Sequence, residues 1–178
     1  MTAKTARSEP PGVYNTNTNA SANQILYKDD LVRANDDAII ALALNILSRR
    51  MVSGPCIDTP RAIRDYLQLK LGQLEHEVFA VVFLTSQHNV IATEILFTGT
   101  LTQTSVYPRE VVKAALRHNS GAIILAHNHP SGIAEPSRAD EYLTSALKQA
   151  LSLVDVRVLD HIIVASQSTV SFAERGLL

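Results

Sequence analysis

Two histidines separated by one residue are the strongest chemical feature of this sequence. His127 and His129 follow an apolar run at residues 123–126, and Pro130 and Gly132 then favour a turn. Side chains two positions apart on an extended chain lie on the same face, so both imidazoles can bind one ligand. Asp140 falls in the first turn of the helix expected next, where it can fold back toward them. Two imidazoles and a carboxylate make a metal-site hypothesis.

The same residues also fit an interpretation without a metal. Ser137 and Asp140 have the Ser-x-x-Asp spacing of a capping box, in which each side chain satisfies a free N–H group at the start of a helix. His127 and His129 can simply end a buried strand. The capping role and the ligand role can coexist, so both interpretations stay open at this point.

The elements expected to position these residues alternate between helical and strand patterns. Apolar residues recur at helical spacing in four segments, 36–50, 60–71, 108–118 and 138–151. Five segments have the pattern of strands: 78–84, 90–97, 122–126, 156–165 and 168–172. The first two strands are expected to form a hairpin. His127 and His129 then lie directly after the third strand and before the last helix.

Composition limits the possible classes of protein. Of 178 residues, 46% are hydrophobic and 19% are charged, which suits one globular domain with an additional segment. The net charge is −1 and no element gathers lysine or arginine, so nucleic-acid binding is not supported by charge. A single cysteine, Cys56, allows no internal disulfide and favours a reducing compartment. The longest aliphatic run, 38–44, is far below the ~20 residues of a membrane helix, so we expect a cytoplasmic protein without a membrane span.

Three regions are predicted along the chain. Residues 1–24 are rich in Thr, Asn, Ser, Ala and Pro and are expected to form a disordered tail, because they offer little apolar surface to offset the entropy of ordering. Residues 25–58 are predicted to be a short N-terminal helical segment. Residues 59–178 hold all the strand patterns and the candidate site, and we expect them to form the functional domain.

The motifs together resemble a known family. An upstream glutamate, His-x-His-Pro, a short spacer and Ser-x-x-Asp are similar to the JAMM metallo-isopeptidase signature of MPN domains. The variant HNHPSG, with EVF before it, GTL and YPREVV between, and DHIIV and SF after it, resembles the bacterial RadC-like branch. The resemblance extends from Thr59 to the C-terminus. It implies an α/β fold in which helices flank a mixed β-sheet, the MPN/JAB or cytidine-deaminase-like architecture, preceded here by the helical segment.

The resemblance also implies an activity and a set of roles. One Zn²⁺ per chain is expected on His127, His129 and Asp140, and a metal-activated water would cleave a peptide or isopeptide bond in a protein or peptide substrate. Glu77 would be the upstream glutamate that takes a proton from the attacking water and gives it to the leaving amine. Ser137 matches the family serine, which helps to hold the tetrahedral oxyanion.

Several alternatives remain open on the sequence. Glu94 and, less readily, Glu135 are other carboxylates that can serve as the general base. His161, next to Asp160, can support the site through a hydrogen bond, although a structural histidine is the commoner case. A DNA-repair-associated role is the alternative function that the RadC name suggests, but the helix-hairpin-helix pattern of longer RadC-like proteins is not evident here. A zinc-bearing interaction module without catalysis is the other alternative.

Overall fold

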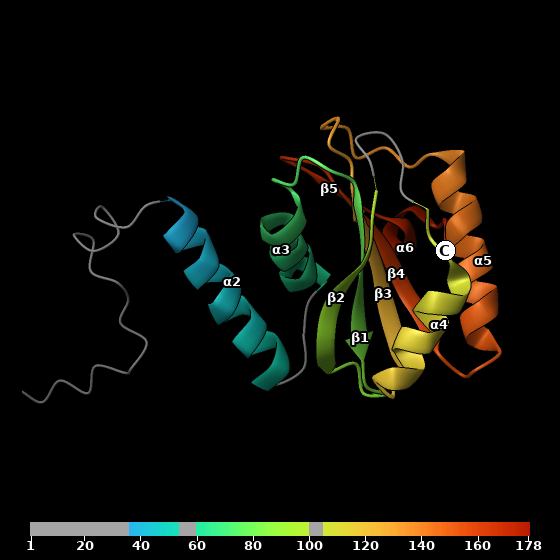
Figure 1. Cartoon of the computed structure of the whole chain (residues 1–178). Helices are drawn as coiled ribbons and strands as arrows, with labels where there is room; N and C mark the ends of the chain where they lie inside the picture. The colour runs from blue at the N-terminus through green and yellow to red at the C-terminus, as the bar shows by residue number, and fades with distance from the viewer. Residues whose placement is uncertain (1–35, 54–59, 100–104) are drawn as a thin grey trace, which may run out of the picture. The chain divides into compact units, whose positions relative to one another are not determined.

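A five-stranded mixed sheet forms the centre of the computed structural model, which describes residues 36–53, 60–99 and 105–178 (Figure 1). The strands are β1 (Val78–Leu84), β2 (Val90–Thr98), β3 (Ala122–Asn128), β4 (Arg157–Val164) and β5 (Thr169–Ser171). Their order in the sheet is β2-β1-β3-β4-β5, and every neighbouring pair is antiparallel except β3 and β4, which run parallel. The mixed sheet expected from the resemblance is therefore confirmed.

Helices cover both faces of this sheet. They are α2 (Asp36–Ser53), α3 (Pro60–Leu71), α4 (Pro108–Arg117), α5 (Arg138–Ser152) and α6 (Phe172–Arg175). α3 lies on one face, and α4 and α5 lie on the other (Figure 1). Alternate residues of β1 divide between the two layers: Ala80 and Val82 pack on the α3 side, whereas Phe79 and Val81 pack with α4 and α5.

The central strands are almost entirely apolar because both of their faces are covered. Every residue of β1 and of β3 is buried, so neither strand has the apolar–polar alternation of a half-exposed sheet. His127 and Asn128 are consequently polar residues at the end of a buried strand. Such positions need hydrogen-bond partners or a ligand, since a buried polar group without one is costly.

The predicted helices all appear, and the predicted apolar face of α3 is confirmed. Its buried residues are Ile63, Tyr66, Leu67 and Leu71. β3 is two residues longer than predicted, because His127 and Asn128 still pair with Ile163 and Val164 of β4. The predicted strand, 122–126, therefore ended two residues too early, at its polar end.

The predicted C-terminal boundary of the last strand, 168–172, was wrong. Phe172 begins the short helix α6 instead of ending β5. Ser171 caps this helix by accepting the N–H of Glu174 at 3.1 Å, and Gly176 ends it in the left-handed conformation at φ 69°. The spacing of Ser171 and Glu174 is typical of a helix start, and the strand prediction did not take it into account.

The N-terminal predictions are only partly covered by the structure. Residues 1–24 and Cys56 lie outside the described residues, and α2 lies within the predicted helical segment 25–58. Leu44 and Leu47 of α2 pack against the apolar cluster on the α3 side of the sheet. Among the helices that the structure describes, none combines the length and the apolar character needed to cross a membrane.

Candidate metal centre

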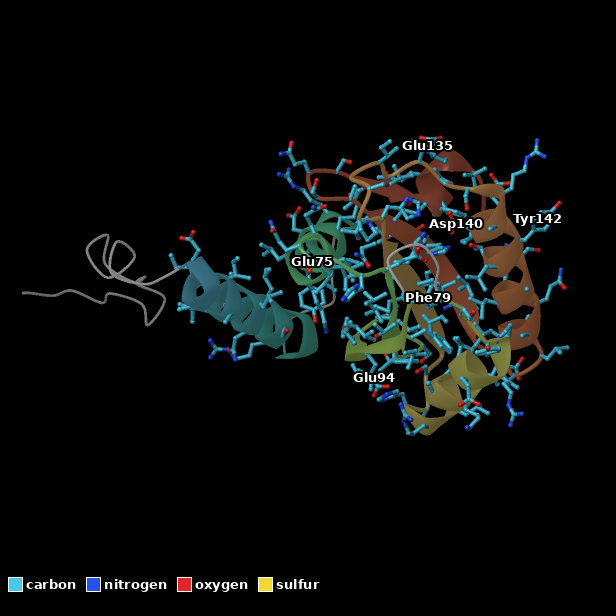
Figure 2. The ribbon with its side chains drawn as sticks, turned by 45° about the horizontal axis from the view of Figure 1, so that its top comes forward. Glu75, Phe79, Glu94, Glu135, Asp140 and Tyr142 are labelled. Carbon is cyan, nitrogen blue, oxygen red and sulfur yellow. The ribbon has the colours of Figure 1, made fainter. Side chains whose placement is uncertain are left out.

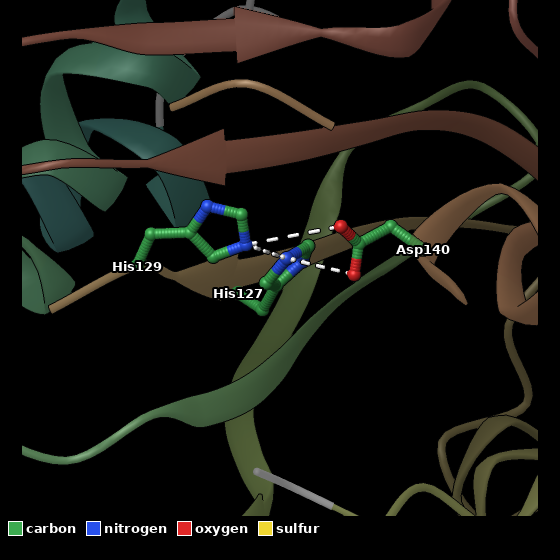
Figure 3. A group of neighbouring side chains, drawn as sticks. All are labelled: His127, His129 and Asp140. Carbon is green, nitrogen blue, oxygen red and sulfur yellow. Dashed lines mark hydrogen bonds and ion pairs between the residues drawn. The ribbon is translucent and has the colours of Figure 1, made fainter. Parts of the chain in front are cut away.

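His127, His129 and Asp140 converge on one point at the end of β3 (Figure 3). The Nε2 atoms of the two imidazoles lie 2.9 Å apart. Oδ1 of Asp140 lies 3.3 Å from Nε2 of His127, and Oδ2 lies 3.8 Å from Nε2 of His129. The sequence thus correctly predicted that these three side chains meet.

These separations fit a metal ion bound by all three residues. Nitrogen and oxygen ligands lie about 2.0–2.2 Å from zinc, so two ligands at tetrahedral positions lie roughly 3.3 Å from each other. Nε2 of His127 lies 2.9 Å from Nε2 of His129 and 3.3 Å from Oδ1 of Asp140, and one ligand atom from each of the three residues lies within 4.8 Å of the others. Imidazole nitrogen and carboxylate oxygen are also the donor types found in catalytic zinc sites.

The backbone continues the sheet beyond β3 and so aligns the two imidazoles. The N–H of His129 donates to the carbonyl oxygen of Val164 on β4 at 2.8 Å, which keeps residues 127–129 extended. Gly132, at φ 81°, then turns the chain so that the carbonyl oxygen of Ile133 reaches Nδ1 of His129 at 2.8 Å. A carbonyl can only accept, so Nδ1 carries the proton and Nε2 of His129 presents its lone pair to the site.

Asp140 serves the start of α5 and the metal centre with different oxygens. Ser137 donates to Oδ2 through its backbone N–H at 2.7 Å and through its hydroxyl at 2.6 Å. The N–H of Asp140 returns a bond to the Ser137 hydroxyl at 3.2 Å, which completes the capping box. Oδ1 still faces His127. The capping box therefore leaves Oδ1 of Asp140 directed toward the histidines.

The carboxyl group of Asp140 is held in its charged form. Its burial favours the neutral acid, but the adjacent imidazole of His127 and the hydrogen bonds from Ser137 outweigh burial and keep the pKa of Asp140 well below its usual range. Position at the N-terminus of α5 adds to this preference, since the helix dipole favours a negative charge there. A charged carboxylate is the form that binds a cation.

The register of the sheet predicts that Glu77 lies on the face that carries the histidines. Phe79 pairs directly with His127, and their rings are stacked at 6.3 Å with an interplanar angle of 12°. Glu77 precedes Phe79 by two residues, so it continues the same face toward the end of the sheet where the candidate ligands converge. Its backbone oxygen accepts the N–H of Gly99 at 2.8 Å, which fixes the chain at this position.

Asn128 holds the segment around Glu77, a role that the sequence interpretation missed. Its side-chain oxygen accepts the N–H of Val78 at 2.8 Å. Its amide group donates to the carbonyl oxygens of Leu74 and His76 at 3.2 and 3.0 Å. The sequence did contain a signal of this role. Asn128 lies at the buried end of an apolar strand, and a buried amide needs several hydrogen-bond partners.

The two other carboxylates considered as bases are paired with other groups. Glu94 on β2 contacts Arg117 and His118 at the end of α4, at 2.5 and 2.7 Å, and it lies well apart from Asp140 (Figure 2). Glu135 forms an exposed ion pair with Arg175 at 2.6 Å. Neither arrangement favours proton transfer at the candidate metal centre.

His161 lies directly behind His127. It is fully buried in β4, and its Nε2 lies 2.8 Å from Nδ1 of His127. Its Nδ1 lies 2.6 Å from the hydroxyl of Thr144 on α5, a residue that the sequence interpretation did not single out. Burial holds the pKa of His161 well below its usual range, so this ring is neutral at pH 7.

Comparisons with known proteins agree with the fold and the motifs. The family model described as RadC-like JAB domain matches residues 57–177. A UPF0758 protein of Leptothrix cholodnii is 62% identical over 146 residues, which cover 82% of this chain and 66% of the relative. Similar proteins of Methylibium petroleiphilum and Nitrosomonas eutropha are 63% identical over 146 residues and 59% identical over 141 residues.

The chain spans slightly less than two thirds of the length of these relatives, between 63% and 66%. The family model nevertheless covers most of this chain, including the strands and the three converging side chains. The chain therefore belongs to the RadC-like JAB domain family.

Proposed function

We propose that this protein is a zinc-dependent hydrolase that cleaves a peptide or isopeptide bond. The observation that carries the proposal is the convergence of His127 Nε2, His129 Nε2 and the charged carboxylate of Asp140 within 4.8 Å of one another. Two neutral donors and one anion leave a net negative site, which suits a divalent cation. Three protein ligands leave one position open, as in catalytic zinc sites.

Zinc bound there would supply a water of lowered pKa and an electrophile for the carbonyl oxygen of the substrate. Glu77 is the residue proposed to remove a proton from the attacking water. Strand alternation from Phe79, which pairs with His127, supports this role, and Asn128 and Gly99 form hydrogen bonds with the backbone at and beside Glu77. After the carbon–nitrogen bond breaks, the same carboxyl group would deliver that proton to the leaving amine.

Ser137 is proposed to stabilise the oxyanion that forms when water attacks the carbonyl. Its hydroxyl now donates to Oδ2 of Asp140. Donation to an oxyanion would require the hydroxyl to rotate away from this carboxylate, while the backbone N–H of Ser137 continues to bind Oδ2. The cap would thus stay partly formed during the reaction.

The test compares Glu77→Gln with Glu75→Gln, a change at an exposed position two residues upstream (Figure 2). Zinc content is measured by mass spectrometry, and hydrolysis is measured on a panel of peptides and lysine-linked isopeptides. We expect both variants to retain zinc and only Glu77→Gln to lose hydrolysis. Wild-type protein that holds zinc but cleaves no member of a broad panel, or Glu77→Gln that cleaves at the wild-type rate, would contradict the proposal.

A further inference from the structure

We propose that Thr144 and His161 form a hydrogen-bond relay that holds His127 in the tautomer able to bind a metal through Nε2. Both would act as positioning residues, because neither lies among the three converging ligands. The inference rests on the metal site of the proposed function. It concerns how that site is prepared, and it can be tested without a substrate.

The direction of the relay is set at its first member, the backbone carbonyl of Asp140. The Thr144 hydroxyl lies 2.6 Å from this oxygen. A carbonyl oxygen has no proton to give, so the single hydroxyl proton of Thr144 must lie between them. If that proton pointed elsewhere, two acceptor oxygens would face each other at hydrogen-bond distance. Thr144 therefore acts as an acceptor toward its second neighbour.

That neighbour is Nδ1 of His161, which lies 2.6 Å from the Thr144 hydroxyl and must donate to it. A neutral imidazole carries one N–H, so the Nε2 of His161 is left as an acceptor. Nδ1 of His127, at 2.8 Å, then has to be the donor of the next bond. With its proton on Nδ1, His127 keeps the lone pair of Nε2 for the metal centre.

The surroundings of His161 favour the neutral ring and exclude water. Its accessible surface is 0%, and the rings of Phe79 and Phe172 lie 5.7 and 4.8 Å from it. A second proton would place an unpaired charge in this apolar enclosure, which is costly. Neutral His161 is therefore held with a fixed donor side and a fixed acceptor side.

Asp160 keeps this enclosure closed. Its carboxylate accepts the Ser171 hydroxyl at 2.6 Å and the N–H of Ala173 at 3.0 Å. These bonds fix the start of α6 against β4 and so hold Phe172 against the His161 ring. The sequence pairs Asp160-His161 and Ser171-Phe172 therefore form one hydrogen-bonded and packed cluster that contacts His127 through His161.

The relay also connects two of the candidate ligands. It begins at the backbone of Asp140, whose side chain faces the metal centre, and ends at His127. Two of its bonds join the elements: Thr144–His161 at 2.6 Å connects α5 to β4, and His161–His127 at 2.8 Å connects β4 to β3. Loss of an outer hydrogen-bond partner of a metal-binding histidine typically weakens metal binding about 10- to 100-fold.

The experiment compares Thr144→Val, Thr144→Ser and His161→Phe with wild type in the full chain. Zinc affinity is measured by competition with a chromogenic chelator. We expect about tenfold weaker binding for Thr144→Val and up to about 100-fold for His161→Phe, with near wild-type affinity for Thr144→Ser, which keeps the hydroxyl. Thermal unfolding of the metal-free proteins shows whether each variant folds.

Nitrogen NMR of the zinc-loaded wild type shows which ring nitrogen of His161 carries the proton. A purely structural role of His161 would not require one particular nitrogen. We expect His161 to carry its proton on Nδ1. A proton on Nε2, or equal zinc affinity in folded Thr144→Val and wild type, would overturn the relay while leaving the metal site intact. Absence of zinc binding in wild type would overturn both. Hydrolysis failing while the affinity pattern holds would overturn only the proposed function.

Discussion

Replacing Ser137 by alanine should separate the stability of α5 from the chemistry of the site. The change removes the hydroxyl that accepts the Asp140 N–H at 3.2 Å and donates to Oδ2 at 2.6 Å, but it leaves the backbone N–H bond of 2.7 Å. Loss of a serine cap typically costs about 1 kcal/mol of unfolding free energy. For a domain of this size, that corresponds to a decrease of about 3–5 °C in Tm.

The same substitution should have a much larger effect on hydrolysis. Removal of one oxyanion donor lowers kcat by about 10²- to 10³-fold, which is equivalent to roughly 3–4 kcal/mol in the transition state. A loss of only 1 kcal/mol in stability leaves nearly all of the protein folded, so unfolding cannot account for such a decrease. The rate effect would therefore report on the hydroxyl itself.

Ser137→Gly is the matched control for the assay. Glycine replaces serine at an N-cap with a loss of only a few tenths of a kcal/mol, yet it also lacks the hydroxyl. Thermal unfolding and kcat are measured for both variants on a substrate that the wild type cleaves. We expect equal losses of kcat and a lower Tm only for alanine. Wild-type kcat in Ser137→Ala would refute the assigned role.

Four further predictions concern the scaffold and the metal. Asn128→Ala removes three hydrogen bonds of a buried side chain, of 2.8, 3.2 and 3.0 Å, and should lower the free energy of unfolding by about 2–4 kcal/mol in urea titrations; a change below about 1 kcal/mol would contradict its anchoring role. Phe172→Ala, at a fully buried position, should cost about 3–5 kcal/mol, measured in the same way. Glu94→Gln should leave kcat unchanged, because the carboxylate is paired with Arg117 on α4, and a large loss would return Glu94 as a candidate base. Zinc at a hundredfold excess over its Kd should stabilise the protein by about 2.7 kcal/mol, and a chelator should reverse this in thermal unfolding, whereas an unchanged Tm would indicate that the folded protein does not bind zinc.

The sequence predicted that His127 and His129 share one face and that Asp140 can fold back toward them, and the three side chains do converge. The two histidines follow a strand whose pattern is clear, and alternation places them on one face; the Ser-x-x-Asp spacing fixes the start of α5. These are short-range rules of backbone geometry. They apply without knowledge of the rest of the fold.

Of the supporting residues, the sequence suggested only His161, without the groups that it contacts. His161 meets His127, and Thr144 meets His161, because β4 pairs in parallel with β3 and α5 packs against the sheet. Asn128 reaches the segment before β1 through the antiparallel pairing of β1 and β3. Such contacts depend on the register between strands that are distant in sequence, and local patterns carry no information about that register.

Zinc content of the purified chain is the measurement that tests the central claim most directly. We expect one zinc per chain in wild type and in Glu141→Gln, a change at the exposed carboxylate beside Asp140. Asp140→Asn and His127→Ala should lose it, because each removes one of the three converging ligands. Stoichiometric zinc that survives His127→Ala would contradict the assignment of the metal centre.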